Sequence, residues 1–398
     1  MKILLINVTC GTGSTGRIVA DTYRLLKTEG HDGKIAYGRG TACGVPIKDT
    51  YKIGSNIDIY VHALMSRITD RTGFYSRTAT KRFIRWIKFY NPDLIHLHNI
   101  HGYYVNIDVL FNFLKSFNKP VVWTLHDCWA FTGHCAHFDY SGCVNWKTEC
   151  HMCPQTRRYP SSYVFDRSNK NYWTKKELFT NIESMTIITP SEWLADIVLC
   201  SFLSSYVVRV INNGIDLEVF KPTNSDFRER YGLFDEIILL GVAAIWDERK
   251  GLRDLIELSK LLEEQYKIVV IGVSQKQLAS LPENMVGIPH TNSVTELAQI
   301  YTASDVFINP THEDNFPTVN IEALACGTPV ITYNTGGSRE AIGESCGLVL
   351  EEKTPEAIKR ELGKLQYNRS ACMNRAQHYK KENRFSDCLD MYKALIKS

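Results

Sequence analysis

Residues 305–343 read Asp305-Val-Phe-Ile-Asn-Pro-Thr-His-Glu-Asp-Asn-Phe-Pro-Thr-Val-Asn-Ile-Glu-Ala-Leu-Ala-Cys-Gly-Thr-Pro-Val-Ile-Thr-Tyr-Asn-Thr-Gly-Gly-Ser-Arg-Glu-Ala-Ile-Gly343. The run from Val306 to Ile308 is β-branched and aromatic, which predicts a buried strand. A polar loop follows, and Phe316-Pro317 leads into a helix with Pro317 near its first position. The helix stops at Gly327, and a second strand follows. This order predicts an α/β sheet in which a helix N-terminus faces the space beyond a strand.

That helix start predicts an anion site. The N–H groups of Thr318 to Asn320 have no partner within the helix, and the helix dipole is positive at this end, so the turn suits a phosphate. Asp314 and Glu322 are separated by seven residues, and both carboxylates can border one cleft and bind sugar hydroxyls. A single acidic residue is more often a cap or a solvated side chain. Here the strand, the turn, the second acid and the Gly336-Gly337 turn occur in order, which favours a site.

The run from Asp314 to Ile331 resembles the signature of retaining, nucleotide-sugar-dependent glycosyltransferases of the group 1 type (family four). The resemblance implies a GT-B fold, in which two Rossmann-like domains face each other across a cleft and a C-terminal helix crosses back to the first domain. The family usually has Glu where this chain has Asp314. Glu313 is the alternative counterpart after a shift of one residue, but Asp314 preserves the seven-residue spacing.

Length and composition agree with two ordinary globular domains. The chain has 398 residues, and single cores stop growing at about 250–300 residues. A net charge of only +3 argues against a nucleic-acid binder that works by bulk electrostatics. No apolar run approaches the length of a bilayer span, and the first eight residues resemble a strand more than a signal peptide. We therefore expect a cytoplasmic protein.

The first residues predict the opening βα unit of a Rossmann-like domain. A β-rich run from Lys2 to Val8 leads into a turn with Gly11, Gly13 and Gly16, and an amphipathic helix continues from Ile18 to Lys27. The glycine spacing is not the full dinucleotide fingerprint, so a nicotinamide cofactor is not indicated. The resemblance places this loop beside the donor diphosphate or the acceptor, which makes Gly13 a candidate donor-binding residue.

Polar side chains follow two strands of the first domain. His98 and His101 follow the strand from Asp93, and His126 and Asp127 follow the strand from Pro120 to Leu125. Because the carboxyl ends of parallel strands line the ligand crevice of an open α/β sheet, these side chains are expected to converge. A lone His is usually a structural residue. The resemblance implies that His126 contacts the donor sugar, and we take it as a candidate catalytic residue.

A cysteine-rich insert follows His126. Cys135, Cys143, Cys150 and Cys153 have the spacing C-x7-C-x6-C-x2-C, whose closing pair suits a tetrahedral metal, and four soft ligands favour zinc. The alternatives are an iron–sulfur cluster, replacement of one thiolate by His134, His137 or His151, and a set of buried reduced thiols. A closed four-ligand site would be structural, because it leaves no position for chemistry. The resemblance implies that catalysis itself requires no cofactor.

The second domain repeats the βα pattern. Arg249 and Lys250 follow the strand from Ile237 to Ala244, where their charges can neutralise a departing diphosphate. The alternative is a solvated helix start. Lys250 matches the lysine of the family's phosphate-binding motif, but the family's arginine falls on Ala244 or Ile245, so Arg249 is taken as its substitute.

Together with these observations, the resemblance implies three segments. Residues 1–205 form a Rossmann-like acceptor domain with the Cys-rich insert at 128–160, residues 206–375 form the nucleotide-sugar donor domain, and residues 376–398 form the helix that packs back. The resemblance implies that Glu322 holds the ribose hydroxyls. It also implies that the sugar and the phosphates are bound by Asp314 and by the backbone of Asn315, Phe316, Pro317 and Thr318.

The leading hypothesis is a retaining transferase that moves a sugar from a nucleotide diphosphate sugar to a hydroxyl of a glycan or a lipid-linked glycan, in polysaccharide biosynthesis at the cell surface. The alternatives are a GT-B nucleotide-sugar epimerase or hydrolase, and a zinc-stabilised binding module. Peripheral contact with the inner face of a membrane is a further hypothesis. It rests on the basic and aromatic residues Arg67, Arg71, Phe74, Tyr75, Arg77, Lys81, Arg82, Arg85 and Trp86, which more often are solvated charges beside core aromatics.

Overall fold

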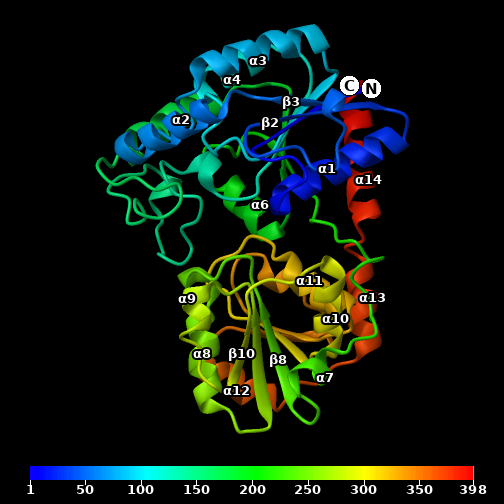
Figure 1. The fold of residues 1–398 in the computed structure, drawn as a ribbon. Helices are drawn as coiled ribbons and strands as arrows, with labels where there is room; N and C mark the ends of the chain where they lie inside the picture. Colours follow the sequence, from blue (N-terminus) through cyan, green and yellow to red (C-terminus); the bar gives the residue numbers. More distant parts are fainter. Residues whose placement is uncertain (398) are drawn as a thin grey trace. The chain divides into compact units, whose positions relative to one another are not determined.

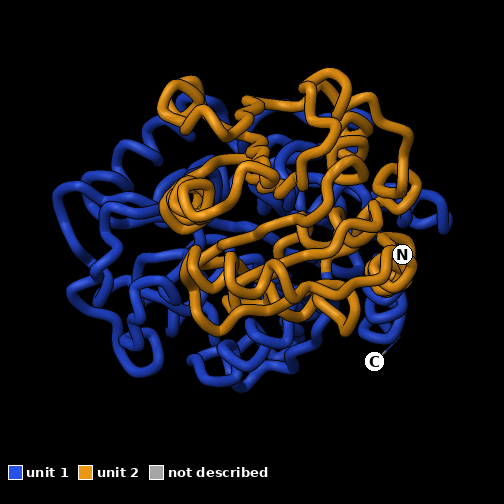
Figure 2. The backbone as a smooth tube through the Cα atoms, turned by 90° about the horizontal axis from the view of Figure 1, so that it is seen from below, with its two compact units in different colours: residues 1–212, 385–398 blue, residues 213–384 orange. Residues whose placement is uncertain are grey.

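The computed structural model describes residues 1–397 and divides the chain into two compact units (Figure 2). Unit 1 comprises Met1–Asn212 and the residues from Phe385 on, and unit 2 comprises Asn213–Arg384. The chain therefore leaves the first unit once and returns to it at its C-terminal end.

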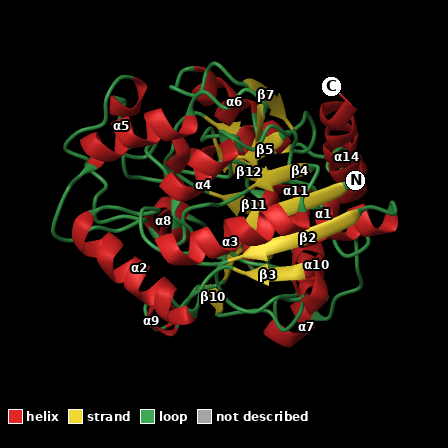
Figure 3. Ribbon diagram, turned by 90° about the horizontal axis from the view of Figure 1, so that it is seen from above, coloured by secondary structure: helices red, strands yellow, loops and turns green. Residues whose placement is uncertain are grey.

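Unit 1 is built on a parallel sheet, which has seven strands within the described residues, in the order β3-β2-β1-β4-β5-β6-β7 (Figure 3). Its strands are β1 (Lys2–Asn7), β2 (Asp32–Tyr37), β3 (Thr50–Lys52), β4 (Leu94–Leu97), β5 (Val121–Thr124), β6 (Met185–Thr189) and β7 (Val207–Val210). Its helices are α1 (Gly13–Thr28), α2 (Asn56–Thr69), α3 (Arg77–Tyr90), α4 (Ile107–Leu114), α5 (Ser168–Phe179), α6 (Glu192–Leu199) and the greater part of α14 (Lys381–Lys397).

The core of unit 1 lies on both faces of this sheet. Leu4 and Ile6 of β1 belong to the cluster on one face, and Ile3 and Leu5 belong to the cluster on the other. This alternation explains why the inner strands are continuous apolar runs, as parallel sheets covered on both faces require. Tyr392 of α14 packs in the second cluster and its hydroxyl bonds to Nδ1 of His96. The C-terminal helix thus packs with the first domain, as predicted.

Unit 2 holds a second parallel sheet, with six strands among the described residues, in the order β10-β9-β8-β11-β12-β13 (Figure 1). Its strands are β8 (Ile237–Val242), β9 (Tyr266–Ile271), β10 (Met285–Ile288), β11 (Val306–Asn309), β12 (Val330–Tyr333) and β13 (Gly347–Leu350). Its helices are α7 (Phe227–Tyr231), α8 (Leu252–Leu261), α9 (Gln275–Leu278), α10 (Val294–Ala303), α11 (Thr318–Ala325), α12 (Pro355–Leu362) and α13 (Arg369–Gln377).

Both sheets have a point at which the strand order reverses. In unit 1, β1 lies between β2 and β4, and in unit 2, β8 lies between β9 and β11. Open α/β sheets bind their ligands at the carboxyl ends of the strands beside such a point. The two Rossmann-like sheets predicted from the sequence are therefore confirmed, and each directs attention to the loops at one sheet edge. Within residues 1–397, every helix is too short or too polar to span a bilayer.

Candidate active site

The decisive loop of unit 2 connects β11 to α11. Pro317 is the N-cap residue of α11, with φ −71°, and Thr318 is its first helical residue. In the parallel register Asn309 of β11 pairs with Thr332 of β12, so the loops that follow these two strands lie side by side. The N–H of Gly337, in the Gly-Gly turn after β12, donates to the carbonyl of Asn315 at 2.9 Å. The helix start and the glycine turn singled out in the sequence are thus in direct contact.

A second loop, between β8 and α8, is tied to this one. The N–H of His312 donates to the carbonyl of Arg249 at 2.7 Å, and Nη1 of Arg249 donates to the carbonyl of Glu313 at 3.0 Å. Nε of Arg249 also binds Asp247 at 3.0 Å. Two of the guanidinium donors therefore hold the protein's own loops together, so the arginine acts as a brace in this structure.

Lys250 and Asp314 form an ion pair between the two loops. Their side chains are 20% and 17% exposed, so both charges are screened from most of the solvent but can still reach a ligand. A cation fixed beside the N-terminus of α11 adds to the positive end of the helix dipole. The arrangement suits an anionic ligand in contact with Lys250.

Gly251 allows the two loops to approach. Its φ is +77°, and a Cβ at this position would lie 2.2 Å from the carbonyl oxygen of Pro310. Because real Cβ atoms essentially never come so close to a backbone oxygen, only glycine fits here. The glycine after Lys250 therefore sets the spacing on which the ion pair depends.

A buried polar network supports the loop from below. Nδ2 of Asn309 donates to Oδ1 of Asn320 at 2.8 Å, and Nδ2 of Asn320 donates to the carbonyl of Ser338 at 3.1 Å. The hydroxyls of Thr332 and Ser338 are 2.6 Å apart. These four residues are at most 6% exposed and join β11, α11, β12 and the following turn. The sequence analysis missed them, although a polar Asn inside the first turn of a buried helix is a signal for such a network.

Two further candidates of unit 2, Glu322 and Phe316, differ in what they can offer a ligand. Oε2 of Glu322 accepts a hydrogen bond from the buried hydroxyl of Tyr301 at 3.2 Å, which orients this carboxylate. Phe316 is 5% exposed and its ring lies 5.7 Å from that of Tyr379, so its side chain is part of the core. A ligand can therefore use only the backbone of Phe316, whereas the carboxylate of the partly buried Glu322 keeps acceptor capacity.

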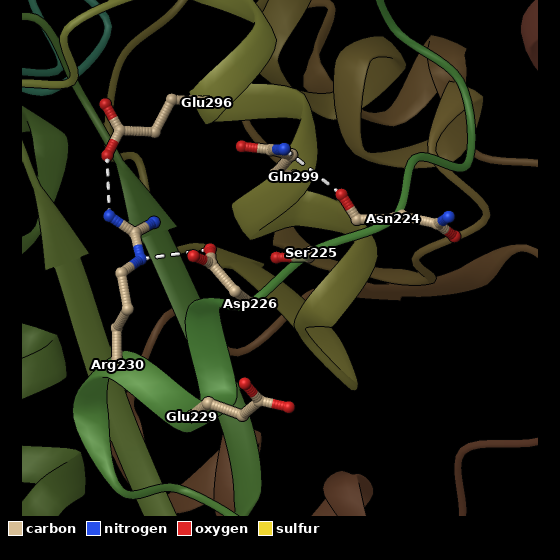
Figure 4. Close-up of a pocket in the computed structure, with 7 residues that line it drawn as sticks. All are labelled: Asn224, Ser225, Asp226, Glu229, Arg230, Glu296 and Gln299. Carbon is tan, nitrogen blue, oxygen red and sulfur yellow. Dashed lines mark hydrogen bonds and ion pairs between the residues drawn. The ribbon is translucent and has the colours of Figure 1, made fainter.

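A separate hollow in unit 2, of about 580 Å³, contains none of the predicted residues (Figure 4). Several of its polar groups bind one another. Arg230 binds Asp226 at 3.0 Å and Glu296 at 3.4 Å, and Gln299 donates to the carbonyl of Asn224 at 3.1 Å. Because these side chains are paired, the hollow offers a ligand little that is not already used. The loops at the sheet edge remain the better site.

In unit 1 the predicted histidines and Asp127 come together at the ends of β4 and β5. Nδ1 of His98 lies 3.0 Å from Nε2 of His126, and Nε2 of His101 lies 2.8 Å from Oδ2 of Asp127. The four residues line one small cavity together with Trp129. The sheet register explains the convergence, since Leu97 pairs with Trp123 and brings the two strand ends to the same level.

The environment keeps the histidine pair neutral. Burial holds the pKa of His98 well below its ordinary value and lowers the pKa of His126 to about 4, although Asp127 opposes the second shift. Burial raises the pKa of Asp127, but the interaction with His101 outweighs this and holds the pKa well below its usual range. At neutral pH one ring of the pair donates the shared hydrogen bond and the other accepts it.

The glycine loop after β1 lies at the same sheet edge. Gly11 has φ +73°, and a Cβ there would collide with the carbonyl oxygen of Cys43 at 2.0 Å. Gly13 has φ +69° but open space where its Cβ would be. The α1 helix begins at Gly13, earlier than predicted, so part of the glycine turn belongs to the helix. Gly13 is therefore the glycine of this turn that leaves room for a ligand.

The Cys-rich insert gives no support to the zinc prediction. The four predicted ligands, Cys135, Cys143, Cys150 and Cys153, do line one small cavity. However, among residues 1–397 no three His, Cys, Asp or Glu side chains are arranged to hold a metal ion. Cys135 and Cys153 hydrogen-bond to each other, and the N–H of Gly133 donates to Sγ of Cys150 at 3.2 Å. The structure does not support zinc here; the four thiols are free, Cys135, Cys150 and Cys153 take part in hydrogen bonds, and all four pack as small apolar groups.

Lys175 of α5 braces this insert and was not predicted. It is 1% exposed, and its Nζ donates to the carbonyls of Trp129 at 2.8 Å and Thr132 at 3.0 Å. Nζ also lies 3.5 Å from the centre of the Trp129 ring. Burial lowers the pKa of Lys175 to about 7. The segment that follows Asp127 is therefore fixed from inside the unit.

The fold defines the class of protein. The solved structure of sucrose-phosphate synthase from Thermosynechococcus elongatus matches with a TM-score of 0.70 at 17% identity, covering 100% of this chain and 99% of that one. WaaG, a glycosyltransferase of lipopolysaccharide biosynthesis, matches with a TM-score of 0.62 at 16% identity, covering 99% of each chain. At these identities the likeness shows the fold, which is GT-B.

Sequence comparisons then show the family. The Glycosyltransferase Family 4 model matches residues 15–219, more than half of the chain, and the Glycosyl transferases group 1 model matches residues 224–384. The chain therefore belongs to glycosyltransferase family 4.

It is 27% identical over 377 residues to the putative colanic acid biosynthesis glycosyl transferase WcaC of Escherichia coli (strain K12), covering 89% of this chain and 88% of the relative. It is 30% identical over 169 residues to the capsular polysaccharide biosynthesis glycosyltransferase CapM of Staphylococcus aureus, covering 39% of this chain and 43% of CapM.

Proposed function

We propose that this glycosyltransferase is a retaining enzyme that moves a sugar from a nucleotide diphosphate sugar to a hydroxyl of a glycan or a lipid-linked glycan, in the biosynthesis of a cell-surface polysaccharide. The observation that carries the proposal is the position of Lys250. Asp314 holds the ammonium group beside the N-terminus of α11, on two loops joined by reciprocal hydrogen bonds.

The relatives support the substrate class. WcaC and CapM are named for colanic acid and capsular polysaccharide biosynthesis, and a structural neighbour, HepE of Anabaena, was solved with UDP-glucose at a TM-score of 0.65 and 15% identity. We place the reaction in the cytoplasm, where the twelve free cysteines would remain reduced.

Unit 2 is assigned the donor. The N–H groups at the start of α11 and the charge of Lys250 would bind the diphosphate, and their stabilisation grows as the leaving group gains charge. Asp314 would bind sugar hydroxyls while it positions Lys250. Glu322, oriented by Tyr301, would accept hydrogen bonds from the ribose hydroxyls. Arg249 adds positive charge but mainly braces the two loops.

Unit 1 is assigned the acceptor and one contact to the donor sugar. A neutral His126 can accept or donate a hydrogen bond to a sugar hydroxyl. His98 fixes the orientation of that ring. Gly13, with open space above its backbone, would let a substrate group approach the start of α1.

The proposed reaction needs no covalent intermediate on the protein. The acceptor oxygen attacks the anomeric carbon from the face on which the diphosphate departs. The bond between that carbon and the diphosphate oxygen breaks, and the acceptor proton passes to the departing diphosphate oxygen. The charge that develops on this group is what Lys250 and the start of α11 would stabilise.

A donor screen tests the proposal. The full chain is incubated with uridine and guanosine diphosphate sugars, with and without glycan acceptors, and nucleoside diphosphate release and sugar products are measured. We expect release that depends on an acceptor, and Glu322→Ala should reduce it strongly while the fold stays intact. Donor turnover that no acceptor stimulates would instead favour an epimerase or hydrolase, and no turnover with any donor would contradict the proposal.

A further inference from the structure

Helix α2 of unit 1 has its amphipathic pattern inverted. Most of its exposed residues are apolar: besides Asn56 and Arg67, they are Ile57, Tyr60, Val61, Leu64 and Ile68, which are 74, 75, 52, 58 and 38% exposed. Their spacing of three and four residues places them on one face. On the opposite face the polar residues His62 and Ser66 are fully buried. An isolated exposed Ile or Leu is ordinary. A continuous apolar stripe on a helix whose buried side is held by polar contacts instead indicates an interaction surface.

Polar contacts hold α2 in this orientation. Nε2 of His62 accepts a hydrogen bond from the N–H of Gly73 at 3.1 Å, so Nδ1 carries the proton and donates to Oγ of Ser76 at 2.9 Å. Ser55 and Asp58 form a capping box at the N-terminus of the helix. Because both nitrogens of His62 are used by the adjoining segment, rotation of the helix to bury its apolar face would break both bonds. The outward stripe is thus built into the fold.

The stripe continues onto a neighbouring loop. The N–H of Tyr163 donates to the carbonyl of Arg67, near the end of α2, at 2.8 Å. In this loop Tyr163, Val164 and Phe165 are 59, 64 and 50% exposed. The α2 stripe and residues 163–165 together form an exposed surface that we call the α2 surface. Its tyrosines suit a boundary between water and an apolar phase, because their rings are apolar and their hydroxyls polar.

Helix α3, which lies next to the α2 surface, is cationic, although the exposed Asp166 directly follows Phe165 in the loop. Helix α3 contains five Lys or Arg residues and no acidic residue, and Lys81, Arg82, Arg85 and Lys88 are exposed. Arg82 is close enough to Asp58, at the start of α2, to lower the pKa of that carboxyl, whose hydrogen bonds to Ser55 have the larger effect. Both helices lie on the outside of unit 1 (Figures 1 and 3). An apolar stripe beside a cationic helix matches a surface that is apolar inside and anionic outside.

We propose that the α2 surface docks unit 1 onto an anionic lipid bilayer, with the stripe inserted among the lipids and α3 above the headgroups. The basic residues of α3 were already candidates in the sequence, but the aromatic candidate Trp86 does not serve here. Trp86 stacks on Tyr51 and Tyr90 inside the unit. A second copy of this chain fits less well, since a symmetric contact through the stripe would bring two cationic α3 helices together.

Vesicle cosedimentation of the full chain tests the docking, with phosphatidylcholine vesicles compared with vesicles that also contain phosphatidylglycerol. We expect binding to the anionic vesicles that weakens with salt. The double variant Ile57→Ser/Leu64→Ser should bind about a hundredfold more weakly, since each buried aliphatic side chain contributes about tenfold. Lys81→Gln/Arg85→Gln should weaken anionic binding about tenfold or more and reduce the difference between the vesicles.

The matched control is Ile47→Ser/Leu199→Ser, which removes the same residue types at 85 and 53% exposed positions of unit 1 outside the α2 surface. It should bind as the unchanged protein does. All variants are exposed, so their thermal unfolding should match the parent. Absence of anionic vesicle binding, or equal loss in control and test variants, would overturn the proposal. So would a dimer in sedimentation velocity that only Ile57→Ser/Leu64→Ser dissociates. Neither assay uses donor or acceptor, so the outcome is independent of the proposed reaction.

Discussion

The two candidate sites, one in each unit, differ in their electrostatics although both lie at the same kind of sheet edge. In unit 2 the reactive groups are charged and paired at the surface, with Lys250 20% and Asp314 17% exposed. In unit 1 the corresponding position after the strand ends holds His98, 2% exposed, hydrogen-bonded to His126, with the pKa of both lowered by burial. A cation beside a helix N-terminus suits a diphosphate, and neutral imidazoles suit sugar hydroxyls. The difference supports assigning the donor's charged end to unit 2.

Removing the positive charge of Lys250 in unit 2 should have the largest effect on turnover. Lys250→Ala removes the cation that we propose stabilises the departing diphosphate, and preorganised groups of this kind contribute about 10²–10³-fold to turnover. We expect a loss of that order in kcat, measured by nucleoside diphosphate release. Lys260→Ala is the matched control, because Lys260 lies in the same unit and is ion-paired with Glu257. Equal activity of the two variants would contradict the role of Lys250.

Changing the backbone next to the Lys250–Asp314 ion pair should have a smaller effect on turnover. Gly251→Ala places a Cβ against the Pro310 carbonyl and should push the two loops apart, lowering turnover by about tenfold and stability by about 1–3 kcal/mol. Gly232 has a similar φ of +64° with open space around its Cβ, so Gly232→Ala carries only the cost of the left-handed backbone. Urea unfolding and turnover of both variants measure the difference. If both retain full activity, the close approach of the loops is not required.

The smallest effect concerns pH, and it should distinguish the units. A histidine whose pKa is lowered by folding binds protons more weakly in the folded protein than in the unfolded chain. The free energy of unfolding is therefore highest above the unfolded pKa, near 6.5, and decreases as the pH falls below it. For His126, with a folded value of about 4, the loss between pH 7 and pH 5 is about 2 kcal/mol. Urea midpoints followed by tryptophan fluorescence mainly report unit 1, which contains six of the seven tryptophans.

A pair of variants separates this effect from general acid sensitivity. His126→Gln should flatten part of the pH dependence, whereas His378→Gln, at an exposed position in unit 2, should leave it unchanged. A parent protein whose stability is constant between pH 7 and pH 5 would show that the histidine edge of unit 1 is not neutral in the way described.

The local sequence predicted those strands and helices whose residues follow one regular pattern of apolar and polar positions. The apolar run at 306–308 is β11, and the helix expected at Pro317 begins at Thr318. The helix α5 was not predicted, because Lys, Asn and Glu are spread around it and Lys175 resembles a solvated residue, although it is buried. Strand β2 was missed for a similar reason, since it begins Asp-Gly-Lys.

The site itself was predictable in its residue types but not in its pairings. Lys250 and Asp314 lie 64 residues apart, and no local pattern indicates their ion pair. The Cys spacing predicted a zinc site, but spacing does not determine whether thiols bind a metal or one another, as Cys135 and Cys153 do. The sequence likewise does not indicate which side of α2 is exposed, because this depends on the distant partners of His62.

A crystal structure of the full chain with a bound nucleoside diphosphate tests the central claim most directly. The account predicts phosphate oxygens within hydrogen-bond distance of Nζ of Lys250 and of the first N–H groups of α11. A diphosphate bound instead at the Arg230 hollow of Figure 4, with Lys250 remote from it, would contradict the account.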